Sequence, residues 1–325
     1  MRFLSLPPRP LPSLCAAAVL SLAAACGTSP APPAGQGAVT KGPPRVALVM
    51  KSLANEFFVT MAEGAKAHQA ASGGAYTLVV NGIRNESDLS QQVALVEQMM
   101  AQGVDAIVIA PADSRALVPV LAKAQRQKIV VVNIDNKLDE PTLQQAGIDV
   151  PFVGPDNRAG AKAVGLALAP QLARGSKVAI LEGIPTAFNA QQRRLGFEDA
   201  MRDAGMTVVS VQSAHWEQDE ANTISAALLR EHPDLKAILA GNDNMALGAA
   251  AAIRQGGKVG AVAVVGFDHI AAVQQLLKEG RIAATADQHG DKLAVYGIEY
   301  ALGILKGETT PQDRQTPVDV IVAPK

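Results

Sequence analysis

Residues 106–134 read AIVIAPADSRALVPVLAKAQRQKIVVVNI and contain one complete strand–helix–strand unit. The apolar run Ala106–Ala110 has the length of a strand, and Ile129–Ile134 is a second such run. Between them, Ala116–Ala124 carries apolar residues at helical spacing. Strands that are apolar along nearly their whole length are typical of parallel sheets covered by helices on both faces. The stretch therefore predicts an α/β fold with doubly wound parallel sheets.

The same alternation continues on both sides of this unit, with helical spacing at Phe58–Ala71 and Leu89–Met100. Two series of strands within about 280 residues indicate two lobes. We expect the break at residues 151–155, between an irregular stretch at 137–147 and a helix capped by Asp156 or Asn157. The other predicted strands are Val46–Met50, Tyr76–Val80, Val178–Leu181, Val208–Val211, Ala237–Ala240, Val262–Val265, Ile282–Thr285 and Thr316–Val322.

Residues 1–25 have the basic, apolar and small regions of a signal peptide. Arg2 and Arg9 are its only charges, and the apolar run Leu14–Ala25 is shorter than the ~20 residues that a spanning helix needs. Cys26 resembles the lipidated cysteine of a bacterial lipobox. Residues 26–44 are then a lipid anchor and a Pro/Gly/Ala tether, and we expect an extracytoplasmic, membrane-anchored lipoprotein. The alternative is ordinary cleavage nearby and a free secreted protein.

The composition argues against nucleic-acid binding and against catalysis. Without Arg2 and Arg9, 27 basic residues stand against 30 acidic ones, a net charge near −3 rather than a basic surface. The sequence has no glycine-rich phosphate loop, no metal-ligating histidine pair and no Gly-x-Ser-x-Gly motif. We expect a binding protein with no catalytic residues, no cofactor and no metal. Cys15 and Cys26 are the only cysteines, so the exported domain has no disulfide.

Aromatic, amide, acidic and basic residues follow the predicted strands. Ligands of open α/β sheets bind outside the carboxyl ends of the strands, so these side chains are expected to face one ligand. Aromatic rings cover the C–H faces of a sugar, while carboxylates, amides and cations bond its hydroxyls. Two carboxylates balance two cations, which favours a neutral ligand. The predicted ligand-binding residues are Lys51, Asn55, Phe57, Phe58, Asp135, Asn136, Arg193, Trp216, Asn242, Asp268 and Gln288.

Each of these residues also has a structural interpretation. The three aromatic residues could belong to the core or pack at an edge, and Asn55 could cap a helix. Asp135 and Asp268 could close turns, and one of Arg193 and Arg194 is expected on a solvated helix face. Asn242 or Asp243 could cap the helix Met245–Ile253, and we expect Asp243 to do so.

These motifs resemble the periplasmic sugar-binding proteins of the ribose- and allose-binding type, which serve bacterial ABC importers. The similarity covers about Arg45 to Val322. It differs from the ribose-binding pattern at Asn136, where an arginine is usual, and at Lys51, where a small hydroxyl residue is usual. An aldohexose, another pentose and a linear polyol are therefore all open. The motifs are KSLANEFF (51–58), VVNID (131–135), GPDN (154–157), RRLGF (193–197), NDNMALG (242–248) and VGFD (265–268).

The resemblance implies the type I periplasmic binding protein fold, with three hinge crossings near Gly154, Gln288 and Asp319. The N-terminal lobe would comprise residues 45–154 and 289–318, and the C-terminal lobe residues 155–288 and 319–325. Phe58 and Trp216 would stack on the ligand with Phe57 as a supporting wall. The polar contacts would come from Asn55, Asp135, Arg193, Asn242, Asp268 and Gln288.

The implied function is that of a monomeric solute-binding component of an ABC importer. It would capture a neutral monosaccharide or polyol by closing its lobes and deliver it to a membrane permease with a separate ATPase. One alternative is a receptor that presents its ligand for chemotaxis or quorum sensing. A transcription regulator of the lac-repressor type would carry a DNA-reading segment where this chain has an export signal. An extracellular carbohydrate enzyme would need a catalytic pair that the sequence does not reveal.

Overall fold

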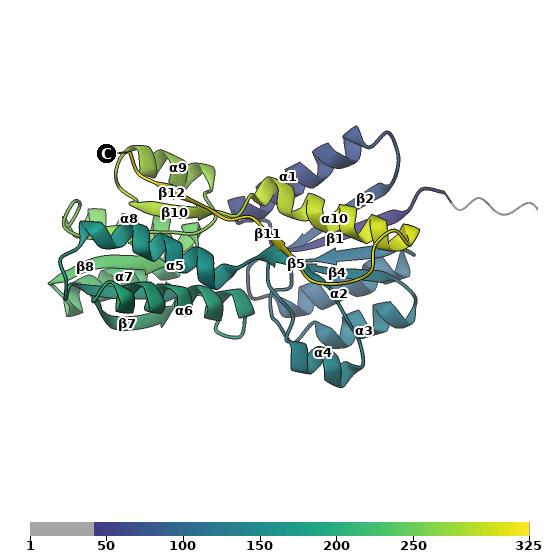
Figure 1. The fold of residues 1–325 in the computed structure, drawn as a ribbon, viewed down its shortest axis with the longest axis horizontal. Coiled ribbons are helices and arrows are strands. Elements are labelled where there is room, and N and C mark those ends of the chain that lie inside the picture. Colours follow the sequence, from purple (N-terminus) through teal and green to yellow (C-terminus); the bar gives the residue numbers. More distant parts are fainter. Residues whose placement is uncertain (1–41, 325) are drawn as a thin grey trace, which may run out of the picture. The chain divides into compact units, whose positions relative to one another are not determined.

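The computed structural model describes residues 42–324 and contains two six-stranded sheets. The expected signal peptide, Cys26 and most of the tether lie outside the described residues. One sheet has the strand order β11-β5-β4-β3-β1-β2, and the other has the order β12-β10-β9-β8-β6-β7. Neighbouring strands are parallel except β10 and β12, which are antiparallel. The predicted α/β class is confirmed (Figure 1).

The first sheet is made by the early strands and one late strand. Its elements, with their helices, are β1 (Arg45–Ser52), α1 (Glu56–Ala71), β2 (Thr77–Ile83), α2 (Leu89–Ala101), β3 (Ala106–Ile109), α3 (Val118–Arg126), β4 (Val130–Ile134), α4 (Glu140–Ala146), β5 (Phe152–Pro155), α10 (Gly290–Lys306) and β11 (Arg314–Thr316).

The second sheet is made by the middle of the chain and the last strand. Its elements are α5 (Asn157–Leu168), a 3-10 turn η1 (Ala169–Gln171), β6 (Lys177–Glu182), α6 (Phe188–Asp203), β7 (Thr207–Ser213), α7 (Gln218–Glu231), β8 (Leu235–Ala240), α8 (Asp243–Gln255), β9 (Ala263–Val265), α9 (Ala271–Lys278), β10 (Ala284–Asp287) and β12 (Asp319–Val322).

Alternate side chains of β1 belong to different cores. Leu48 and Met50 pack in one cluster with Met61 of α1, whereas Val49 packs in another with Leu121 of α3. Successive residues of a strand point to opposite faces, so a strand that is apolar at every position needs helices on both sides. Figure 1 shows α1 and α10 on one side of this sheet and α2, α3 and α4 on the other.

The structure corrects two expectations about the connections. The stretch predicted to be irregular contains α4, because Asp139 caps its first turn and Gly147 ends it at a φ of 65°. Residues 151–155, where the break is expected, are mostly β5, and the chain leaves the first sheet directly after this strand. The single strand predicted at 316–322 is two strands in different sheets, β11 and β12.

The chain passes between the two sheets three times: after β5, after β10 and between β11 and β12. The exact lobe boundaries at 154/155, 288/289 and 318/319 stay predictions. None of the helices that the structure describes combines the length and apolar character that a membrane span needs. Within residues 42–324, no group of three or more His, Cys, Asp or Glu side chains is arranged to hold a metal ion.

Candidate functional site

The carboxyl edges of the two sheets contribute to one small pocket. Nine of the eleven predicted ligand residues line it, and Glu86 and Asn189 line it in addition. The lining is Lys51, Asn55, Phe57, Phe58, Glu86, Asp135, Asn189, Arg193, Trp216, Asn242 and Asp268.

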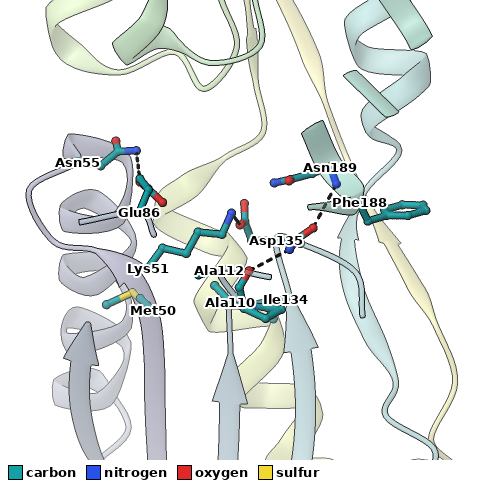
Figure 2. A network of polar contacts seen from close by, with 12 residues as sticks. Met50, Lys51, Asn55, Glu86, Ala110, Ala112, Ile134, Asp135, Phe188 and Asn189 are labelled. Atoms are coloured by element: carbon teal, nitrogen blue, oxygen red, sulfur yellow. Dashed lines mark hydrogen bonds and ion pairs between the residues drawn. The ribbon is translucent and has the colours of Figure 1, made fainter. Parts of the chain in front are cut away.

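An ion pair joins the ends of β1 and β4. Lys51 Nζ lies 2.9 Å from Asp135 Oδ2, and both side chains are buried (Figure 2). Asp135 adopts a φ of 62°, a left-handed conformation that a non-glycine residue takes only where the surrounding structure holds it. The short turn after β4 thus holds the carboxylate against the ammonium group.

Asn136 lies behind this pair rather than in the pocket lining. Its Nδ2 donates to the carbonyl oxygen of Pro111 at 2.9 Å, and its Oδ1 accepts from the backbone N–H of Asn189 at 3.1 Å. Both ends of the amide are therefore engaged by backbone groups. Asn136 was predicted to contact the ligand directly. In the structure its amide group joins a loop of the first sheet to the start of α6.

Asn55 both caps a helix and lines the pocket. Its Oδ1 accepts from the N–H of Phe57 at 3.0 Å, and its Nδ2 donates to Glu86 Oε1 at 3.0 Å. Burial raises the pKa of Glu86 to about 7, against the opposing effects of Lys51 and of the Asn55 hydrogen bond. Glu86 follows β2, an edge strand after which sequence analysis placed no ligand residue.

Three aromatic rings form the walls. Phe57 and Phe58 pack edge to face with their centroids 5.2 Å apart. Trp216 is only 3 % exposed and has a φ of 72°, so it is a constrained wall rather than an edge residue. Lys51 Nζ lies 5.7 Å from the ring centroids of both Phe58 and Trp216, which places the charged group between the two aromatic faces.

Arg193 is the buried member of the Arg193–Arg194 pair. Its Nε donates to Asn157 Oδ1 at 2.8 Å, its Nη1 donates to the carbonyl oxygen of Gly241 at 3.0 Å, and its guanidinium lies 3.8 Å from the ring centroid of Phe267. Nη1 is also 3.4 Å from Asp268 Oδ1. These contacts fix the plane of the guanidinium group at the base of the pocket.

Gln288 supports the pocket without lining it. Its Nε2 donates to Asp268 Oδ1 at 2.7 Å, so it orients the carboxyl group that faces Arg193. Burial raises the pKa of Asp268 well above its ordinary value, and Arg193 acts in the opposite direction. Gln288 Oε1 is buried without a hydrogen-bond partner, so the predicted direct contact from Gln288 stays a prediction.

Asn242, and not Asp243, caps α8. Asn242 Oδ1 accepts from the N–H of Met245 at 2.9 Å. Asp243 is the first helical residue, and its buried carboxyl group accepts from Thr285 Oγ1 at 2.7 Å and from the N–H of Ile270 at 3.0 Å. The expectation that Asp243 is the cap is wrong because its side chain turns into the sheet, where burial raises its pKa to about 7.

Unpartnered polar atoms are concentrated in this pocket. Among residues 42–324, nine buried side-chain nitrogen or oxygen atoms lack a hydrogen-bond partner, and five of them belong to pocket residues. A buried polar atom without a partner costs about 1–3 kcal/mol, so such atoms in one pocket indicate groups that a ligand would satisfy. They are Glu86 Oε2, Asp135 Oδ2 (close to Lys51 but without a directed hydrogen bond), Asn189 Oδ1, Arg193 Nη2 and Trp216 Nε1.

Loops that belong to the two sheets are joined around the pocket. Besides the Asn136–Asn189 contact, the N–H of Phe188 donates to Ser114 Oγ at 2.9 Å, and the N–H of Ala271 donates to Glu56 Oε1 at 2.8 Å. These polar contacts are few, so they can break together when the two lobes move apart, as a hinged closure requires.

Comparison with known proteins identifies the family. The periplasmic binding protein domain matches residues 46–309. The chain belongs to the periplasmic binding protein family. It is 56 % identical over 291 residues to the D-ribose/D-allose-binding protein of Pseudomonas aeruginosa, covering 88 % of this chain and 91 % of that protein.

Two solved structures of this family have closely similar folds. An ABC transporter solute-binding protein from Burkholderia multivorans is 54 % identical with a TM-score of 0.85, and the match covers 87 % of this chain and 100 % of that one. A periplasmic solute-binding protein from Actinobacillus succinogenes with bound D-allose is 34 % identical with a TM-score of 0.81, covering 86 % and 98 %. The family is one of binding proteins, in agreement with the expectation that the chain is not an enzyme.

Proposed function

We propose that this periplasmic binding protein is the solute-binding component of an ABC importer and that its solute is a neutral monosaccharide or polyol. The unpartnered donors and acceptors between aromatic walls carry the proposal. Apart from Asp135 Oδ2, which pairs with Lys51, two of them are acceptors and two are donors, and a hydroxyl group can serve either kind. The D-ribose/D-allose-binding relative and the D-allose-bound structure support the same class of ligand.

The proposed mechanism is closure of the two lobes on the sugar. The first sheet supplies Lys51, Asn55 and Asp135, whereas the second supplies Arg193 and Trp216. A ligand that touches both sets stabilises the closed form through contacts that the open form lacks. The closed monomer then docks on a membrane permease whose ATPase is a separate subunit.

Direct binding tests this function. We expect D-allose or D-ribose to raise the thermal unfolding midpoint, with a gain of about 2.7 kcal/mol at ~100 times the dissociation constant. A sugar phosphate and a linear amino acid serve as controls, and neither is expected to shift the midpoint. A panel of pentoses, aldohexoses and polyols that leaves the midpoint unchanged would contradict the proposal and favour a receptor for another signal molecule.

We also propose that a lipid on Cys26 holds the protein at the outer side of the membrane. The sequence supports this proposal through the apolar and small residues that precede Cys26. Each buried methylene of an acyl chain contributes about 0.8 kcal/mol of membrane affinity, so two chains anchor a protein stably.

Substitution at the two cysteines tests the anchor. Cys26→Ala is expected to move nearly all of the protein from the membrane fraction to the soluble extracytoplasmic fraction. Cys15→Ala, which changes the other cysteine of the export segment, is expected to leave the distribution unchanged. The same distribution for both variants would argue for ordinary cleavage and a free protein.

A further inference from the structure

Glu86 places a partly unsatisfied carboxyl group in the pocket. It lies in the loop between β2 and α2 and is only 3 % exposed. Oε1 accepts from Asn55 Nδ2 at 3.0 Å, whereas Oε2 is buried without a hydrogen-bond partner (Figure 2). A carboxylate can accept about four hydrogen bonds, so most of its capacity is unused.

The charged groups around Glu86 do not neutralise it. Lys51 is the nearby cation, and its ammonium group is 2.9 Å from Asp135. Asp135 and Glu217 face Glu86 as further carboxyl groups, and the N–H of Glu86 donates to Glu217 Oε1 at 3.4 Å. In the part of the chain that the structure describes, Glu86 forms no ion pair within 4 Å. Another hydrogen-bond donor is therefore needed at Oε2.

Glu86 also changes the charge of the pocket. The four charged residues predicted from sequence balance each other, but Glu86 adds a third carboxyl group to the lining. An ionised Glu86 gives the pocket lining a net negative charge. This charge disfavours binding of an anionic sugar and favours a neutral ligand that donates a hydrogen bond. A hydroxyl group has the right size and polarity for this role.

We propose that Glu86 is a selectivity residue of the sugar site, whose free oxygen accepts a hydrogen bond from one hydroxyl group of the ligand. This inference rests on the proposed function. A site built to bond a hydroxyl rejects the analogue that lacks it, because the buried polar group is then left unpaired. Glu86 therefore discriminates against the sugar that is deoxygenated at that position and against sugar acids and phosphates.

Sugar binding through Glu86 depends on pH. The pKa of Glu86 is raised from 4.5 to about 7. The folded protein therefore holds a proton that the unfolded chain has released, and this group's contribution to stability declines as pH rises from about 4.5 to about 7. A hydroxyl donates best to the ionised form, so sugar binding favours loss of the proton and becomes tighter as pH rises through 7.

Titration calorimetry with D-allose and D-ribose tests Glu86→Gln against the unchanged protein at pH 6 and pH 8. For the unchanged protein we expect affinity to rise by up to about tenfold between these pH values. Glu86→Gln is expected to weaken binding at pH 8 by about 10- to 100-fold, the size of a hydrogen bond to a charged acceptor, and to lose the Glu86 part of the pH dependence. Equal affinities and equal pH profiles would overturn the inference.

Three further measurements separate ligand contact from a structural role. The ligand-free Glu86→Gln protein is expected to unfold at least as high in temperature as the unchanged protein at pH 8, because it lacks a buried charge. Glu217→Gln removes the neighbouring carboxylate; the same loss of affinity in this variant would overturn the inference. Glu86→Asp keeps the carboxyl group but moves it away from the ligand by one methylene. We expect this variant to bind the sugar more weakly and to keep the pH dependence of binding.

Monodeoxy sugars identify the hydroxyl group. We expect that removing one particular hydroxyl group weakens binding to the unchanged protein strongly but weakens binding to Glu86→Gln only slightly. In a double-mutant cycle, this difference indicates a direct contact between Glu86 and that hydroxyl group. Additive losses at every position would overturn a direct contact. If no sugar binds even the unchanged protein, the proposed function fails first, and that result is distinct from a variant that binds as well as the unchanged protein.

Discussion

Arg193→Ala is expected to lower the free energy of unfolding by about 3–5 kcal/mol, the cost of removing one partner of a buried ion pair. The substitution leaves Asp268 buried without its cation and removes donors from Asn157 and the Gly241 carbonyl. Because burial already raises the pKa of Asp268, protonation of this carboxyl group reduces the loss at lower pH. Sugar binding should fall below detection, since Nη2 and the plane of the guanidinium are lost together.

The neighbouring arginine provides a matched control. The Arg194 side chain is 37 % exposed, and its nearest carboxylate oxygen, on Glu182, lies 3.5 Å away. Such a pair contributes at most about 1 kcal/mol, so Arg194→Ala should barely change unfolding in urea or the dissociation constant. Arg193→Lys keeps the charge but cannot reproduce the planar set of contacts, and we expect it to recover some stability without recovering affinity. Equal effects of the two alanine variants would contradict the assigned role of Arg193.

Sequence could predict the layers of the fold because burial on both faces leaves a local record. Strands such as β1 and β4 are apolar at consecutive positions, and the helices between them have apolar spacing of their own. The connections were harder to predict. Two prolines and a glycine in residues 151–155 indicated a break, and they concealed the strand β5 that precedes the crossing to the second sheet. Residues 137–147 were expected to be irregular, but Pro141 lies in the first turn of α4, where a missing N–H is tolerated.

Topology explains why so much of the pocket could be predicted. Residues that directly follow parallel strands meet at one sheet edge whatever their distance along the chain, so Asp135 and Asp268 were found from their positions alone. That rule cannot tell which side chain of a polar pair faces the ligand. Asn136 is bonded to backbone groups behind the pocket, Gln288 is bonded to Asp268 of the pocket lining, and Asn242 caps the helix that Asp243 was expected to cap.

The residues that sequence analysis missed lie where the pattern is weakest. Glu86 follows the edge strand β2, three residues beyond its end, in a loop without an aromatic residue or a recognisable motif. Its place in the pocket lining depends on burial beside Asn55 and Lys51, which is a property of the folded chain. A charge balance taken from sequence therefore underestimated the acidity of the pocket.

Gly183→Ala is expected to weaken sugar binding by at least about tenfold, because the new methyl group would displace the Trp216 wall. A Cβ atom at Gly183 would lie 2.0 Å from the indole ring atoms Cε2 and Cζ2, far inside van der Waals contact. The indole is 3 % exposed, so it cannot move without disturbing its neighbours. Overpacking of this kind lowers the free energy of unfolding by about 1–3 kcal/mol. We therefore expect Gly183→Ala to fold, with a pocket whose Trp216 wall is displaced.

Trp216 is the only tryptophan of the chain, so its fluorescence during a D-allose or D-ribose titration reports on this wall directly. Gly241→Ala is the graded control, because its Cβ would lie 3.4 Å from Trp216 Cζ3 and 3.2 Å from the Leu181 carbonyl oxygen. This variant should bind within about threefold of the unchanged protein, a difference of under about 0.7 kcal/mol. If Gly183→Ala gave the emission spectrum and affinity of Gly241→Ala, the indole would be free to shift and could not be a fixed stacking surface.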